Sequence, residues 1–421
     1  MIMIAGYLIN LFSGLLIAEV AINQYEASSC DVPSSFKEFA DVNLKSNSAG
    51  TFVAIISVFV NMCVLSFDFV RGGQLMTENQ QLGSILAPIF GADILSTPAA
   101  EHCGAAVAAA AIMTLVGTQR SDVLSKIASI CCVTLFISFA GLVGPGLVSI
   151  HDPVAAFMAP GTFPIGSPDF SSSLSALIPI ALMTLIYQNI IPTITKMLNY
   201  DRTQVVSAIA LGSCFPMLMF ISFCFTEIGS GGAASALSTG GIFMAGIRMS
   251  SLVGSAMAGT LSIGQELDIF LGSDKSAKKS NKSSPFNDDD VELLDVVGSE
   301  ESCLTDGAKG HTLTMSSVAL SAIPPLLAGI IFSGGEGFVG ALSLSGSYGT
   351  PILYGFVPIL LAFNQRYGSV NKEDEKVSLI EKEIDSSNHI APGGMVSLGL
   401  LGVGSIALIS NQLIADVSNL I

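Results

Sequence analysis

The apolar residues of this chain fall into repeated runs of about 20, the number that an α-helix needs to cross the roughly 30 Å hydrocarbon layer of a bilayer. Half of the 421 residues are hydrophobic, only 12% are charged, and the mean hydropathy is +0.66. No single water-soluble core could absorb so much apolar surface. Membrane β-strands are much shorter and alternate in polarity. The sequence therefore predicts an all-α polytopic membrane protein embedded in the lipid bilayer.

Ten spans can be placed along the chain, and the whole of residues 1–421 is predicted to form one transmembrane domain. The third span is the weakest, because it is short and rich in alanine. The first has no basic residues ahead of it and is longer than the apolar part of a signal peptide, so we interpret it as a span. The predicted spans are residues 2–22, 49–70, 102–118, 124–148, 174–198, 204–226, 250–271, 312–333, 338–363 and 394–416.

The lysines and arginines are strongly biased to one side of this arrangement. The loops after the odd-numbered spans hold fifteen of the 17 basic residues, and only Arg71 and Arg248 lie opposite. Since basic residues accumulate on the cytoplasmic side, these loops are predicted to be cytoplasmic and both termini to lie opposite. Two of them, 272–311 and 364–393, are long and polar. We expect surface segments there, the first disordered, with a regulatory or phosphorylated role as the alternative.

The ionisable residues are too scattered to suggest catalysis or metal binding. The four histidines lie in or near loops, and most of the eight cysteines sit inside apolar runs, where they act as small hydrophobic residues. No nucleophile elbow or phosphate-binding loop occurs. The net charge of −16 comes mostly from loops and says nothing about nucleic acid. We therefore expect neither an enzyme nor a cofactor, a metal or a nucleic-acid partner.

One predicted span carries polar residues at its centre. The stretch "IPIALMTLIYQNIIPTITKML" has Tyr187, Gln188 and Asn189 in its middle and Pro192 just beyond. Pro192 cannot donate to the carbonyl of Gln188, and in hydrocarbon every backbone group must be satisfied by protein. Two interpretations are open. The helix is broken to hold substrate or ions, as in secondary transporters, or it is merely kinked, with its amides bonded to neighbouring helices.

Other polar groups within the spans favour structural roles. Glu19, at the end of the first span, is expected at the membrane interface in preference to a buried functional position. Asn61 and Asp68 are seven residues apart and share one helix face. Asp68 is also three residues before Arg71, which predicts an ion pair at the end of the second span.

Small residues dominate the span at 250–271 and indicate close helix packing. The alternative is that Ser255 or Thr260 faces a substrate or an ion. Pro324 and Pro325 interrupt a later span without amides nearby, so a kink explains them.

The central stretch, extended to "IPIALMTLIYQNIIPTITKMLNYDRTQV", resembles the sixth-helix signature of the aromatic amino-acid permeases. This is the tyrosine/tryptophan transporter group of the amino acid-polyamine-organocation superfamily. Its core, an aromatic residue, His or Gln, Asn or Gly, two further residues and a proline, is here Tyr187, Gln188, Asn189 and Pro192. The stretches "GLLIAEVAIN", "SLVGSAMAGTLSIGQELDIFL" and "SSVALSAIPPLLAGIIFSGGEGFVG" are similar to the family's second, eighth and ninth helices, and the likeness runs on into the tenth.

The resemblance implies a broken-helix amino-acid transporter fold of eleven helices, built from two five-helix inverted repeats. Substrate would bind between the unwound centres of helices one and six. The ten spans match helices two to eleven, and nothing in the chain corresponds to the first. We expect an incomplete gene model whose true start lies upstream, with a native transport-dead relative as the alternative.

The resemblance also implies a secondary active transporter of amino acids, of the aromatic class (tyrosine or tryptophan), coupled to H⁺ or Na⁺ by alternating access. Tyr187, Gln188 and Asn189 would line the substrate site, Pro192 would mark the helix break, and Ser255 and Thr260 would be neighbours from the eighth helix. A competing hypothesis is a membrane receptor or scaffold whose working part is the loop 272–311. The sequence leaves open the amino acid carried, the coupling ion and the oligomeric state. It also leaves open whether the membrane is the plasma membrane or an organellar one such as that of a plastid.

Overall fold

The computed structural model describes residues 2–28, 35–78, 98–148, 150, 178, 182–229, 241–280, 313–331, 342–367 and 390–420. Within these ranges every regular element is a helix. Eight of the described helices are long and apolar enough to cross a membrane. They are α1 (Ile2–Ser28), α3 (Asn47–Glu78), α6 (Pro98–Thr118), α7 (Ser121–Val148), α11 (Arg202–Gly229), α13 (Gly241–Ser280), the continuous run η2 (Ser345–Gly349), η3 (Pro351–Phe356) and α17 (Val357–Tyr367), and α19 (Gly394–Leu420).

The prediction of an all-α polytopic membrane protein is confirmed, and eight of the ten predicted spans coincide with these helices. The alanine-rich third span is among them as α6. The span at 312–333 is the apolar helix α15 (Met315–Ile331), whose 17 residues are short for a crossing. The span at 174–198 lies only partly within the described residues, and there it is not one helix. The count of ten spans stays a prediction.

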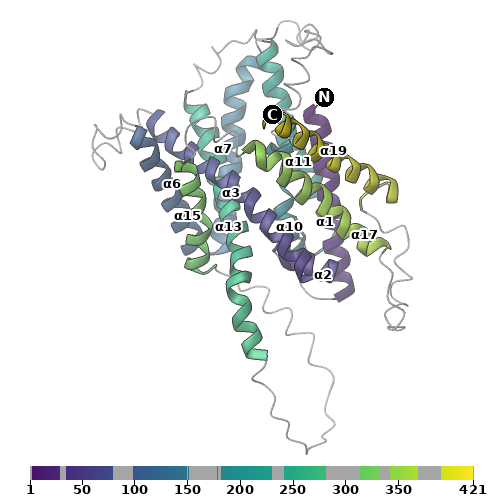
Figure 1. Cartoon of the computed structure of the whole chain (residues 1–421). Helices are drawn as coiled ribbons and strands as arrows, with labels where there is room; N and C mark the ends of the chain where they lie inside the picture. The colour runs from purple at the N-terminus through teal and green to yellow at the C-terminus, as the bar shows by residue number, and fades with distance from the viewer. Residues whose placement is uncertain are drawn as a thin grey trace, which may run out of the picture.

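Both chain termini lie at the upper end of the molecule in Figure 1, whereas α2 and the C-terminal end of α13 lie at the lower end. This is the arrangement expected if the termini lie opposite the basic loops. Helix α13 continues to Ser280, into the predicted loop 272–311. The remainder of that loop, and residues 368–389 of the loop 364–393, lie outside the described residues.

The helices pack around two separate hydrophobic clusters. One cluster joins α3, α6, α7, α13 and α15, which we call the α3 half. The other joins α1, α2, residues 182–198, α11, the 345–367 run and α19, which we call the α1 half. Helix α3 also contributes Val53 and Val60 to this second cluster, so it forms part of the contact between the halves. In the α3 half, α3 and α6 approach closely, since a Cβ on Gly104 would lie 2.8 Å from the Cα of Gly73.

A short helix that the sequence did not predict, α2 (Phe36–Leu44), connects the two halves. At its N-terminus, Glu266 of α13 accepts hydrogen bonds from the first two backbone amides of α2, at 2.7 and 3.4 Å. A carboxylate is favoured there because the free N–H groups and the helix dipole both attract negative charge. At its C-terminus, Asn43 donates to Gln24 of α1 (2.9 Å) and accepts from Gln365 of α17 (2.7 Å).

The link between the central segment and α11 is a tight turn. Asn199 and Tyr200 have φ values of 51° and 59°, and the ring of Tyr200 stacks on Tyr25 of α1 at 3.8 Å between centroids. Asp201 precedes α11 and accepts a hydrogen bond from the backbone N–H of Gln204 (3.0 Å). This bond holds the pKa of the Asp201 carboxyl below its usual value. Asp201 thus provides an ordinary N-terminal cap for α11.

Candidate functional site

The segment that carries Tyr187, Gln188 and Asn189 is unwound in its middle. Residues 182–184 form one helical turn, and the chain leaves the helix at Leu185, Ile186 and Tyr187. It continues as a 3₁₀ turn, η1 (Gln188–Ile190), and then as α10 (Ile191–Met197).

Pro192 is not where the helical hydrogen bonding fails. It lies in the first turn of α10, where a missing N–H costs little, and the chain has already left the helix seven residues earlier, at Leu185. The carbonyl of Gln188, expected to lack a partner, accepts a bond from the backbone N–H of Ile191. The prediction that the carbonyl of Gln188 lacks a hydrogen bond is therefore wrong.

Side-chain amides satisfy the backbone groups that the break sets free. Asn10 of α1 donates from Nδ2 to the carbonyl of Leu182 (3.3 Å). Gln188 donates from Nε2 to Oδ1 of Asn10 (2.6 Å) and accepts from the backbone N–H of Tyr187 at Oε1 (2.9 Å). The hydroxyl of Tyr187 donates to the carbonyl of Asn10 (3.3 Å). Asn10 is 2% exposed and Gln188 0%, so this network replaces helical hydrogen bonds inside the protein.

The three predicted substrate residues differ in what they can offer. Gln188 is fully buried, and both ends of its amide are bonded, so in this conformation it holds the unwound segment against α1. Tyr187 and Asn189 are half-buried. Asn189 donates to Oδ1 of Asn61 on α3 (3.4 Å), which joins the unwound segment to the other half of the molecule.

The ring of Tyr187 lies closely against α1. A Cβ on Gly14 would lie 2.9 Å from the Tyr187 hydroxyl oxygen and 3.0 Å from Cδ1 of Ile191. Glycine at position 14 therefore permits the approach of α1 to the unwound segment.

Within the described residues, Ser255 and Thr260 take no part in this hydrogen-bond network, and their role at the substrate stays a prediction. Both lie on α13, and neither hydroxyl bonds to residues 187–189 in the part of the chain that the structure describes. The Ser255 hydroxyl faces the carboxyl group of Asp68 on α3. Thr260 is completely buried, and among the described residues its hydroxyl has no hydrogen-bond partner.

The partners of two charged residues differ from those expected. Glu19 is buried within the protein, at 1% exposure, and its carboxylate binds the guanidinium of Arg366 through two contacts of 2.7 Å. It also accepts from the backbone N–H groups of Ile390 (2.9 Å) and Ala391 (3.0 Å), which fastens α1 to α17 and to the start of α19. The depth of Glu19 in the membrane stays a prediction.

The expected ion pair between Asp68 and Arg71 is also absent. Arg71 donates instead to Gln74 (2.9 Å), and within the described residues no contact of 4.0 Å or less pairs it with Asp68. Both residues line a cavity at the end of the span, which is described below.

Asn10 is a functional candidate that was not predicted from the sequence. It is a lone amide inside the first apolar run, which otherwise has the composition of an ordinary span. The same reasoning that singled out Gln188 and Asn189, an amide at membrane depth that needs a partner, also applies to Asn10.

Comparison with protein families shows to which family of proteins the chain belongs. The model described as the tryptophan/tyrosine permease family matches residues 1–255, more than half of the chain. The chain belongs to the tryptophan/tyrosine permease family. The permease is therefore a multi-pass integral membrane protein of a family of amino-acid transporters, not of enzymes.

The matched stretch contains the unwound segment, with Pro192, and ends at Ser255. Thr260 lies beyond it, as do α15 and the 345–367 run, so their resemblance to the family's later helices stays a prediction. A comparison with curated proteins gives no match. No group of three or more His, Cys, Asp or Glu residues that could hold a metal ion occurs within the ranges given above.

Proposed function

We propose that the permease is a secondary active transporter of aromatic amino acids and that substrate binds beside the unwound segment 185–189. The observation that carries this proposal is the break itself, whose freed backbone groups are held by Asn10 and Gln188. Ends of interrupted helices are where transporters of this architecture bind the charged groups of their substrates. A simple proline kink would not require three residues before the proline to leave the helix.

The residues then take distinct roles. The half-buried ring of Tyr187 lies against the aromatic side chain of the substrate, and the amide of Asn189 contacts the polar head. Gln188 is a positioning residue, because its amide is fully engaged with Asn10 and with the backbone of Tyr187. Ser255 and Thr260 approach from α13, and the unpartnered hydroxyl of Thr260 offers an oxygen to substrate or ion.

Alternating access would proceed as a relative movement of the two halves. The separate hydrophobic clusters support this, as does the grouping of α3 with α6 and α13 with α15 in one body. The contact between Asn189 and Asn61 crosses between the halves and would change during transport. An H⁺ or Na⁺ gradient would drive the cycle.

Uptake of radiolabelled tyrosine, tryptophan and phenylalanine by proteoliposomes, under an imposed H⁺ or Na⁺ gradient, tests the proposal. Gln188→Leu together with Asn189→Leu should abolish uptake while membrane insertion is kept. The control is Gln119→Leu, which changes an amide on the short α6–α7 link that bonds only locally to Thr118. Unchanged uptake in the double variant would refute the site.

Removal of residues 281–312 separates this proposal from the scaffold hypothesis. A transporter whose substrate site lies among the helices should keep gradient-driven uptake after the deletion. A protein whose working part is this loop would show no substrate uptake with or without it.

A further inference from the structure

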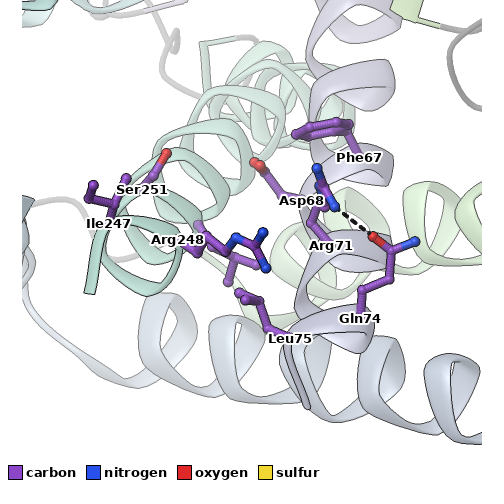
Figure 2. A pocket seen from close by; sticks show the side chains of 9 residues that line it. Phe67, Asp68, Arg71, Gln74, Leu75, Ile247, Arg248 and Ser251 are labelled. Carbon is purple, nitrogen blue, oxygen red and sulfur yellow. Dashed lines mark hydrogen bonds between the residues drawn. The ribbon is translucent and has the colours of Figure 1, made fainter. Parts of the chain in front are cut away.

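A cavity lies between α3 and α13 (Figure 2). Its volume is about 170 Å³, more than ten times the roughly 10–15 Å³ that one water needs. It is lined by Phe67, Asp68, Arg71, Gln74 and Leu75 of α3 and by Ile247, Arg248, Ser251 and Leu252 of α13.

The two arginines of this cavity are the two basic residues that lie opposite the basic loops. Fifteen of the 17 lysines and arginines are on the other side, yet Arg71 and Arg248 meet at one cavity although 177 positions separate them in the chain. At about 1.5 Å per residue, Arg71 is roughly 36 Å along α3 from its start at Asn47, near the far end of the span. Both arginine side chains are exposed, as is usual for basic residues near the ends of membrane helices.

The exposed side chain of Arg71 contacts two neighbours on its own helix, α3. Its guanidinium donates to Gln74 (2.9 Å) and lies 5.9 Å from the centre of the Phe67 ring. Figure 2 shows Arg248 of α13 and Asp68 of α3 directed toward the space between the two helices, whereas the guanidinium of Arg71 lies along α3 between Phe67 and Gln74.

A carboxylate completes the cavity. Asp68 is 6% exposed, and its Oδ2 has no hydrogen-bond partner within the described residues. Ser255, one turn beyond Ser251 on α13, faces this carboxyl group. The cavity thus combines two guanidinium groups, one buried carboxyl group and an apolar lining from Phe67 and Leu252. A simple anion would use only the arginines, whereas a zwitterion matches both the arginines and the carboxyl group of Asp68.

We propose that this cavity binds the zwitterionic head of a free amino acid, with its carboxylate between Arg71 and Arg248 and its ammonium group at Asp68. The apolar lining would contact the substrate side chain. This inference rests on the proposed function and extends it. Asp68 is seven residues from Asn61, or about 10 Å along α3, and Asn61 contacts Asn189 of the unwound segment. The cavity would therefore be a waiting site, which substrate occupies before it reaches the break.

The chain contains no tryptophan, so Phe67→Trp places a single fluorescent reporter in the cavity and keeps an aromatic ring beside Arg71. The full chain with this change, in vesicles of phosphatidylcholine and phosphatidylglycerol, is titrated with phenylalanine, which does not absorb where the indole is excited. The signal should saturate. Arg71→Gln with Arg248→Gln, or Asp68→Asn, should weaken binding at least about tenfold, because each removes a charged hydrogen-bond partner.

Matched variants and ligands separate the possible outcomes. Arg120→Gln, which removes a basic residue on the opposite side, should leave the titration unchanged. The double change Gln188→Leu and Asn189→Leu should also leave it unchanged. Phenylalanine methyl ester, which lacks the carboxylate, and 3-phenylpropionate, which lacks the ammonium group, should both bind weakly.

A signal lost in the Gln188 and Asn189 variant would mean that the reporter senses only the central site, and the proposal would be wrong. The proposal would also be wrong if no phenylalanine response occurred. Phosphatidylethanolamine carries the same pair of charges. A signal shift on adding this lipid that phenylalanine cannot reverse would assign the cavity to a lipid headgroup. A saturable response without gradient-driven uptake would leave the cavity proposal standing and refute the transport function.

Discussion

Among the apolar segments that carry proline, two differ clearly in backbone structure. Helix α15 is continuous from Met315 to Ile331 although it contains both Pro324 and Pro325. The segment from Leu182 to Met197 contains only Pro192, yet it leaves the helix at 185–187. The difference is that Asn10 and Gln188 offer hydrogen bonds to the freed backbone groups of the second segment. In this protein, side-chain amides rather than proline account for where a membrane helix unwinds.

The same contrast extends to the two halves. The α1 half contains the unwound segment, the π-helical run at 345–356 and the buried pair of Glu19 and Arg366. The helices of the α3 half are unbroken within the described residues, and α3 and α6 meet through glycines. Irregular helical turns with wide hydrogen bonding are frequent at functional sites. We infer that the α1 half carries the local rearrangements of transport and that the α3 half serves as the frame.

The largest loss of stability should come from breaking the buried ion pair between Glu19 and Arg366 in the α1 half. Arg366→Met leaves the carboxylate of Glu19 buried without its partner and should lower the free energy of unfolding by about 3–5 kcal/mol. Adding Glu19→Gln should recover part of the loss. Thermal unfolding in detergent measures both.

The control for the ion pair is Arg202→Met, because Arg202 pairs at 3.2 Å with Glu26, whose side chain is 52% exposed. The Arg202→Met change should lower the free energy of unfolding by less than about 1 kcal/mol. Equal losses in the Arg366 and Arg202 variants would show that the buried pair has no special role in fastening α1.

A smaller but more specific effect is expected from Asn10→Ala. The change leaves the carbonyl of Leu182 and the amide of Gln188 without partners, each worth about 1–3 kcal/mol when buried. Uptake should fall at least about tenfold. The comparison variant is Ser13→Ala. Ser13 lies on α1, as Asn10 does, and the change removes a single hydrogen bond to the carbonyl of Tyr354. If both variants transported equally well, Asn10 would not be what holds the break.

Gly14→Ala tests how closely the ring of Tyr187 must approach α1. The new methyl group would meet the hydroxyl oxygen of Tyr187 at 2.9 Å. Displacement of the Tyr187 ring should cost about 1 kcal/mol of substrate-binding free energy, which would raise the KM for uptake roughly fivefold. Gly212→Ala on α11 has no described atom within 4 Å of the added Cβ and should leave KM unchanged. Identical behaviour of the two variants would argue against a role of Tyr187 at the substrate.

The smallest effect should come from Pro192→Ala. Because Pro192 occupies the first turn of α10, its replacement should change uptake by less than about twofold. Hydrogen–deuterium exchange over residues 185–188 should also remain as in the parent protein. Slowed exchange together with lost uptake would show that the proline, and not the amides, keeps the segment unwound.

Most of the fold could be predicted from the sequence, because the bilayer imposes a length and an apolar composition on each crossing. The position of the break could not. The missing N–H of Pro192 is a local signal and predicts the wrong position. The break depends on Asn10, whose partner Gln188 is 178 residues away in the chain. Helix α2 escaped prediction because nine partly polar residues give no signal of a span; its ends are defined by tertiary contacts with Glu266 and Gln365.

Helix α2 also limits how the two halves can move. Nine residues at about 1.5 Å each give a rod of about 13 Å, with α13 bonded at one end and α1 and α17 at the other. While those bonds persist, the halves cannot draw apart at this end of the molecule. If the halves move as proposed, rotation about the two ends of α2 would remain possible, and the displacement would be larger at the opposite face than at this one.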